Sequence, residues 1–127
     1  MSRDVRRGLI AKIEKEGERK MVRVIIERRC LPGKEAELES LLVELRSGSM
    51  RQRGYISGET LRSVDDPSLW LVISTWVDAD LWKVWKTMAE RQEIERKIEP
   101  LLVAPDKVSI FNFAGRGGAE SAHTIDK

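Results

Sequence analysis

LWLVISTWVDADLWKVW, residues 69–85, contains all four tryptophans of the chain and decides its fold. The first half alternates as a strand does, so that every second residue from Trp70 to Trp76 falls on one face. After Trp76 the apolar period lengthens to about 3.6 residues, as in a helix. Asp78 stands at the changeover, where a carboxylate can cap the start of a helix. The stretch therefore predicts a buried strand that runs directly into a helix.

The predicted helix also offers a ligand site. Its apolar residues recur at helical spacing and fall on one side, namely Leu81, Val84, Trp85 and Met88. An apolar pocket between this helix and the strand is the natural place for a ligand. We therefore expect Trp76, Trp82, Trp85 and Met88 to bind it, with one of the two helical tryptophans in the core and the other at a surface.

Composition excludes several classes of protein. The 127 residues are 41% hydrophobic and 35% charged, with a net charge of +2, which is too small to indicate nucleic-acid binding. No apolar run approaches the ~20 residues of a membrane span, and no signal peptide is apparent. Cys30 is the single cysteine, which rules out an internal disulfide or a cysteine-based zinc site and fits the cytoplasm. We expect it to be a small buried side chain.

The chain divides into three parts. Residues 1–20 hold seven Lys or Arg and four Asp or Glu and predict a charged helical extension. Residues 21–113 form one domain, and the Gly-rich, polar residues 114–127 predict a flexible tail. In the domain, the patterns predict strands at 21–30, 54–64, 69–77 and 107–113, and helices at 35–50 and 78–98, the latter broken near 87–90.

This order is the ferredoxin-like βαββαβ plan of the α+β class, with an antiparallel sheet. Two helices cover one face of such a sheet. The strand at 69–77 is apolar on both faces, which indicates a cover on both. We therefore expect two copies to pair sheet to sheet as a homodimer.

An ordered set of motifs resembles the antibiotic biosynthesis monooxygenase family, the small dimeric α+β barrel proteins. The resemblance covers roughly residues 21–113. It rests on Leu31-Pro32-Gly33-Lys34-Glu35, Gly54-Tyr55, Asp65-Asp66-Pro67, Ile73-Ser74-Thr75-Trp76, an acidic helix start and Pro100-Leu101-Leu102.

One branch of this family oxidises polycyclic aromatic phenols with dioxygen, without metal or flavin. The resemblance implies catalytic roles for Trp76 and for Arg96, which falls at the ungapped position of the branch's arginine. Val72 stands where that branch has Asn, and Trp82 where it has Tyr, so both are candidate binding residues without the same hydrogen bonds. The implied function is a cofactor-independent monooxygenase of a small aromatic or quinol-like substrate. The alternatives are a non-catalytic ligand-binding module and a dimerisation module.

A second branch binds and degrades haem through a histidine on the second helix. The single histidine here is His123, in the predicted tail, so we expect no haem, no other cofactor and no metal site. Among the remaining polar residues, Asn112 interrupts the apolar last strand and is a candidate to line the cavity. Arg91 and Arg96 are expected on a solvated helix face.

Overall fold

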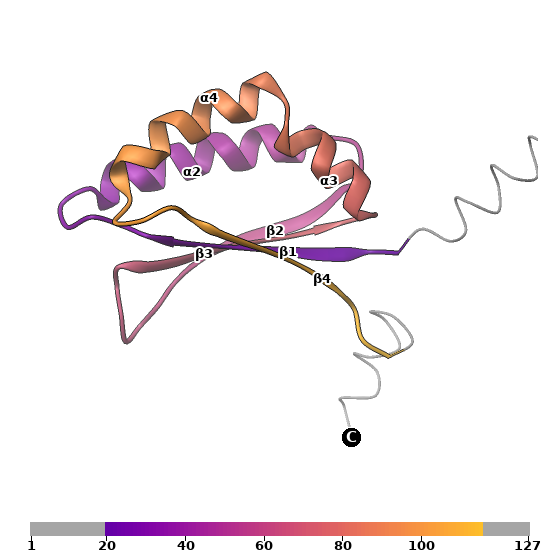
Figure 1. The fold of residues 1–127 in the computed structure, drawn as a ribbon, viewed down its shortest axis with the longest axis horizontal. Helices are drawn as coiled ribbons and strands as arrows, with labels where there is room; N and C mark the ends of the chain where they lie inside the picture. The colour runs from indigo at the N-terminus through magenta and orange to yellow at the C-terminus, as the bar shows by residue number, and fades with distance from the viewer. Residues whose placement is uncertain (1–19, 116–127) are drawn as a thin grey trace, which may run out of the picture.

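The computed structural model describes residues 20–115, which fold as a sheet covered by helices (Figure 1). The extension expected at 1–20 and the tail expected at 114–127, with His123, lie outside these residues except for Lys20, Ala114 and Gly115. The elements, in chain order, are β1 (Val22–Arg29), α2 (Glu35–Met50), β2 (Tyr55–Arg62), β3 (Leu69–Trp76), α3 (Ala79–Lys86), α4 (Ala89–Ile98), the 3-10 helix η1 (Glu99–Leu101) and β4 (Lys107–Asn112).

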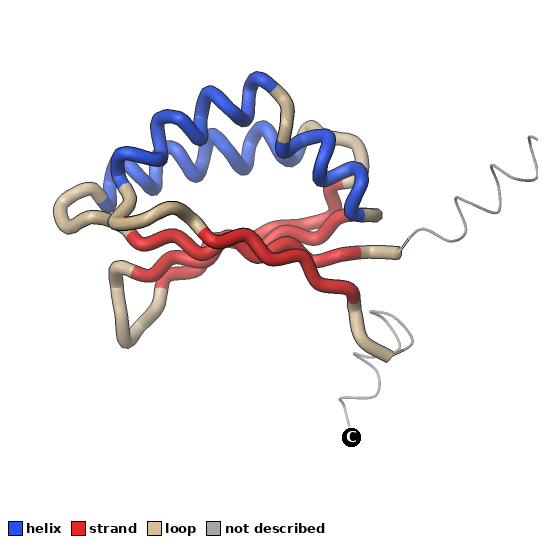
Figure 2. Tube along the Cα trace, in the orientation of Figure 1, coloured by secondary structure: helices blue, strands red, loops and turns tan. Residues whose placement is uncertain are grey.

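The strands pair in the order β2-β3-β1-β4, and each pairing is antiparallel. All the helices lie on one face of this sheet (Figures 1 and 2). The arrangement is the ferredoxin-like α+β fold that the sequence predicts, and each predicted strand and helix is present to within two residues at its ends apart from the break between α3 and α4.

The core lies between the sheet and the helices. On β1 the alternation buries Val22, Val24 and Ile26, and the paired strand β3 adds Trp70 and Trp76 to the same face. From the helices and the turns that follow them come Leu38, Leu42, Leu45, Trp82, Trp85, Ile94, Ile98 and Leu101. Cys30 is buried here too, as predicted, and burial together with the nearby Glu35 raises the pKa of its thiol, which makes it a poor nucleophile.

The helix after β3 is two helices. Asp78 caps the first of them, since its Oδ1 accepts the backbone N–H of Leu81 at 2.8 Å, as the sequence predicts. The chain leaves the helical conformation at Met88, whose φ and ψ of −68° and 143° are extended, and α4 begins at Ala89. The break falls within the predicted interval.

The face that α3 buries differs from the predicted one. Trp82 and Trp85 are both buried, so neither is at a surface, whereas Val84 is 58% exposed and Met88 is 38% exposed. Residues three apart share a helix face, and the two largest apolar side chains take the inner one. Met88 lies in the break between α3 and α4. The helical spacing that grouped Met88 with Trp85 assumes one continuous helix and therefore does not apply to it.

The other face of the sheet is left uncovered by residues 20–115 (Figure 2). Its centre is apolar, because Ile25 of β1 pairs with Ile73 of β3, and both are only half-buried. Leu61 and Phe111, on the flanking strands, are 45% and 51% exposed. An apolar sheet face of this kind is what the predicted homodimer would bury.

Gly48, buried in α2, gives the first testable prediction. A Cβ there would lie 2.6 Å from Cη2 and 3.1 Å from Cζ2 of the Trp85 ring. Ala in place of Gly gains about 1 kcal/mol of helix propensity, but overpacking against a rigid buried ring costs about 1–3 kcal/mol. We expect Gly48→Ala to lower the free energy of unfolding in urea, whereas Ser47→Ala, at the exposed neighbour, should not. If Gly48→Ala is as stable as wild type or more stable, the Trp85 ring can move aside without an energetic cost.

Candidate functional site

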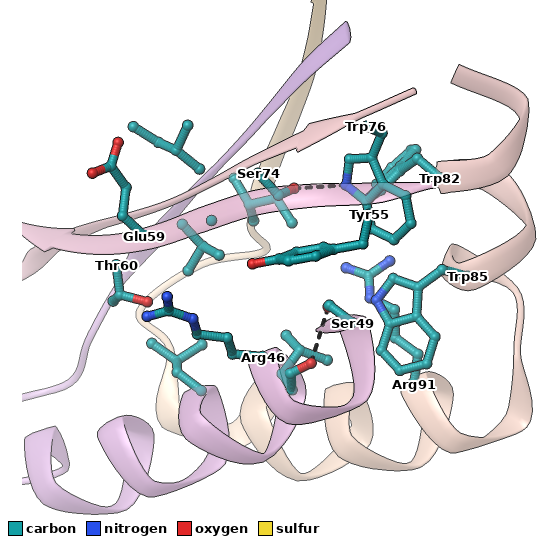
Figure 3. A pocket seen from close by; sticks show the side chains of 16 residues that line it. Arg46, Ser49, Tyr55, Glu59, Thr60, Ser74, Trp76, Trp82, Trp85 and Arg91 are labelled. Carbon is teal, nitrogen blue, oxygen red and sulfur yellow. Dashed lines mark hydrogen bonds between the residues drawn. The ribbon is translucent and has the colours of Figure 1, made fainter. Parts of the chain in front are cut away.

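A cavity of about 40 Å³ lies between the sheet and the helices, at the side of β2 (Figure 3). In the same measure one water needs about 10–15 Å³, so the space holds a few water-sized groups. Both the sheet and the helices contribute to its lining, which consists of Ile26, Leu42, Leu45, Arg46, Ser49, Tyr55, Gly58, Glu59, Thr60, Val72, Ile73, Ser74, Trp76, Trp82, Trp85 and Arg91.

Four aromatic rings form one end of the cavity. Trp76 closes β3 and is fully buried, and its ring meets that of Tyr55 edge to face, with centroids 5.5 Å apart and planes at 88°. Trp82 and Trp85 approach from α3 (Figure 3). An aromatic enclosure of this kind favours a flat apolar ligand.

A bulge in β2 brings Tyr55 into the cavity. Tyr55 pairs with Trp76, but Ser57 pairs with Thr75, so the intervening Ile56 is an extra residue. The bulge turns Tyr55 onto the same face of the strand as Gly58 and Thr60. Strict alternation without the extra residue would have placed Tyr55 on the opposite face. A Cβ on Gly58 would lie 2.6 Å from the Tyr55 hydroxyl oxygen, so the absence of a side chain there makes room for that hydroxyl.

The hydroxyl groups of the cavity differ in what they already bind. Ser74 Oγ accepts the indole N–H of Trp76 at 2.9 Å, and Ser49 Oγ donates to the carbonyl of Leu45 at 3.0 Å. The Tyr55 hydroxyl has no hydrogen-bond partner within residues 20–115 (Figure 3). It is the group best placed to bond to a ligand oxygen.

Arg91 places a positive charge against the cavity. It extends from α4, is only 4% exposed, and its guanidinium lies 5.7 Å from the centroid of the Trp82 ring. Burial lowers the pKa of the Arg91 guanidinium, and Glu95 beside it opposes that shift. A guanidinium is not deprotonated in proteins, so the charge stays. Its Nε has no partner in the described part of the chain, which leaves a buried donor for a ligand.

Behind Arg91, an ionic cluster fixes the charge in place. Arg28 has a side chain with no exposed surface, and its Nη2 donates to Glu95 Oε1 at 2.5 Å and lies 3.5 Å from Asp106 Oδ2. The same oxygen of Glu95 lies 3.6 Å from Nη2 of Arg91. One carboxylate thus serves two buried guanidinium groups, one on β1 and one on α4.

The sequence-predicted site residues fall into two groups. Val72, Trp76, Trp82 and Trp85 line the cavity together. Met88, Arg96 and Asn112 do not line it, as Met88 lies in the break between the helices, Arg96 pairs with Glu93 at the surface and Asn112 is exposed at the end of an edge strand. The expectation that Asn112 lines the cavity is therefore corrected for the single chain.

Sequence reasoning did not include Arg46, Tyr55 and Arg91 among the site residues. The expectation that Arg91 is solvated is wrong, since it is buried. A signal was present, because Arg91, Ile94 and Ile98 are spaced three and four apart and share the buried face of α4. No comparable signal exists for Tyr55, whose position depends on the bulge.

A wider cleft of about 600 Å³ lies between the end of α4 and the loop before β4. Arg96 lines it, with Glu95, Glu99 and Asp106, and no aromatic side chain does. The wider cleft lacks the aromatic lining that a flat apolar ligand needs. The smaller cavity is therefore the better candidate for the binding site of such a ligand. No group of three metal-binding side chains occurs in residues 20–115, and none of the helices described there is long and apolar enough to cross a membrane.

Fold and cavity together define a ferredoxin-like α+β domain with an aromatic, cationic pocket beneath its helices. The chain belongs to the antibiotic biosynthesis monooxygenase family, whose model matches residues 21–97. The match includes β1 to α4 and hence every residue that lines the cavity.

Comparisons with individual proteins agree with this family. SchA of Streptomyces halstedii is 28% identical over 79 residues, which are 62% of this chain but 21% of SchA. SnoaB of Streptomyces nogalater, a cofactor-independent oxygenase, superposes with a TM-score of 0.67 at 19% identity, covering 79% of this chain and 97% of SnoaB. A candidate antibiotic biosynthesis monooxygenase of Nitrosomonas europaea gives 0.72 at 17% identity, covering 80% and 97%. At these identities the two structures show a shared fold.

Proposed function

We propose that this protein is a cofactor-independent monooxygenase that oxidises a small phenol or hydroquinone in the cavity beside Trp76. The observation that carries the proposal is the buried Arg91 charge against an aromatic enclosure. Family membership supports it, as does the likeness in fold to SnoaB, which is an oxygenase of this kind.

The chemistry asks three things of the protein, namely to bind a flat ring, to help it lose a proton and to stabilise the resulting anion. The aromatic walls provide the first. A nearby positive charge lowers the pKa of a phenol, and Arg91 supplies that charge from a buried position. The Tyr55 hydroxyl, which has no other partner in the described residues, can hold a ring oxygen.

For hydroquinone the reaction balances without any other reductant. Hydroquinone and O₂ give hydroxybenzoquinone and water, so one oxygen atom enters the ring, the other leaves as water, and the substrate supplies all the electrons. The phenolate made at Arg91 is the species that transfers an electron to O₂. The released proton passes to water through the open side of the cavity at β2.

A second candidate is a binding protein without turnover. It is favoured by the absence of a base at the aromatic end of the cavity, since the lining residues include no histidine, and Glu59, their single carboxylate, lies away from Trp76 (Figure 3). Oxygen consumption separates the two candidates, because a binding protein would take up the ring and leave O₂ untouched.

The test compares two arginines on α4. With hydroquinone as substrate, Arg91→Met is expected to slow oxygen uptake at least about ten-fold, because the anion loses its buried partner. Arg91→Lys should retain part of the rate. Arg96→Met is the matched control, since Arg96 is 70% exposed in its side chain and outside the cavity. Equal loss in both Met variants, or none in Arg91→Met, would contradict the proposal.

A further inference from the structure

We infer that the cavity is selective for single-ring phenols or hydroquinones that carry a carboxylate, with Arg46 at its mouth as the residue that recognises the carboxylate. This rests on the proposed site and adds a substrate class to it. The size of the cavity and the placement of Arg46 in its lining carry it.

Size limits the ring system. A partly open space of about 40 Å³ holds about three water-sized groups, at about 10–15 Å³ for each. One ring can enter if part of it remains at the open side, whereas fused rings would require Tyr55 or the core residues Leu42 and Leu45 to move aside. Since cores are close-packed, that movement carries a cost that a single ring avoids.

Positive charge lies at two places along the cavity. Arg91 lies against the Trp82 ring, and Arg46 extends from α2 toward Thr60, with Tyr55 between the two in Figure 3. A ring whose phenolic oxygen faces Arg91 therefore presents its other edge toward Arg46. A carboxylate on that edge would meet a guanidinium, which binds carboxylates with paired hydrogen bonds.

Arg46 is free to take such a group. Three surface arginines have acidic partners, Arg29 with Asp66, Arg51 with Glu90 and Arg96 with Glu93, whereas the exposed Arg46 and Arg53 have none within residues 20–115. Arg46 makes no ion pair or hydrogen bond within residues 20–115, although it lines the cavity. Because Arg46 is exposed, a carboxylate there keeps part of its hydration and avoids the cost of full burial.

The experiment measures binding without oxygen, by quenching of tryptophan fluorescence in the full chain. The probes are 2,5-dihydroxybenzoate and hydroquinone, which differ by the carboxylate alone. Wild type should prefer the carboxylate probe about 2- to 5-fold, the range of an exposed charged pair, and the preference should shrink as salt is added.

Arg46→Gln should abolish this preference, because the carboxylate then has no guanidinium to pair with. Arg53→Gln is the matched control, since Arg53 is also exposed, makes no side-chain hydrogen bond or ion pair within residues 20–115 and does not line the cavity. The inference is overturned if wild type shows no preference, if both variants lose it alike, or if Arg46→Gln weakens both probes equally.

Oxygen uptake keeps this inference separate from the proposed function. Uptake with both probes and no carboxylate preference would overturn the inference and leave the monooxygenase standing. A preference that depends on Arg46, with no uptake from either probe, would uphold the inference and overturn the monooxygenase.

Discussion

Glu95→Gln is expected to lower the free energy of unfolding by about 3–5 kcal/mol, the usual cost of leaving a buried charge without its partner. The carboxylate bridges Arg28 and Arg91, whose side chains are 0% and 5% exposed. The amide keeps the size of the side chain and removes its charge. Asp106, 3.5 Å from Arg28, is then the one carboxylate of the described residues left to two guanidinium groups. Urea denaturation measures the change, and the melting temperature should fall by more than about 10 °C.

Glu93→Gln is the control for this variant, two residues earlier on α4. Its partner Arg96 is exposed, and exposed ion pairs contribute about 0–1 kcal/mol, so its stability should be close to that of wild type. Adding Arg91→Met to Glu95→Gln should restore part of the loss, because it removes one of the two stranded charges. Similar stability of the two single Gln variants would show that water reaches and solvates the cluster.

Ile73→Glu is expected to convert a homodimer into a monomer. Wild type should scatter light with about twice the chain mass of 14.5 kDa, because the uncovered sheet face offers an apolar centre at Ile25 and Ile73. An obligate dimer buries about 2,000 Å² or more, and a carboxylate at the centre of such an interface would be desolvated without a partner.

Val43→Glu controls for the added charge on the helix side, since Val43 is 61% exposed on α2. It should leave the mass at the dimer value. A wild-type protein that has the mass of one chain at micromolar concentration would refute sheet-mediated pairing, and a dimer that survives Ile73→Glu would place the interface elsewhere.

The sequence predicts the fold well because its signals are local. Alternation along residues 69–76, the leucine spacing of α2 and the cap at Asp78 each depend on neighbouring residues, and each is found in the structure. The break between α3 and α4 shows where such reasoning stops. An ungapped comparison with the family that starts from Trp76 places the site arginine at Arg96. The chain, however, leaves the helical conformation at Met88, and the new helix α4 turns Arg91 toward the core.

Two other features of the site lie beyond single-sequence reasoning. The bulge at Ile56 reverses the side on which Tyr55 emerges, and a pattern of period two cannot show one added residue. The ionic cluster joins Arg28 to residues 67 and 78 positions later, so it exists only once β1, α4 and the loop before β4 have come together.

The break at Met88 separates the aromatic residues that α3 contributes to the cavity from the charged residue that α4 contributes. Trp82 and Trp85, two of the three tryptophans that line the cavity, belong to α3, while the charge of Arg91 belongs to α4 and is tied to β1 through Glu95 and Arg28. Shape and charge are therefore encoded in separate segments. If the proposed function holds, a descendant of this chain could come to accept a different ring through substitutions in the eight residues of α3, with Arg91 and its ionic cluster inherited unchanged.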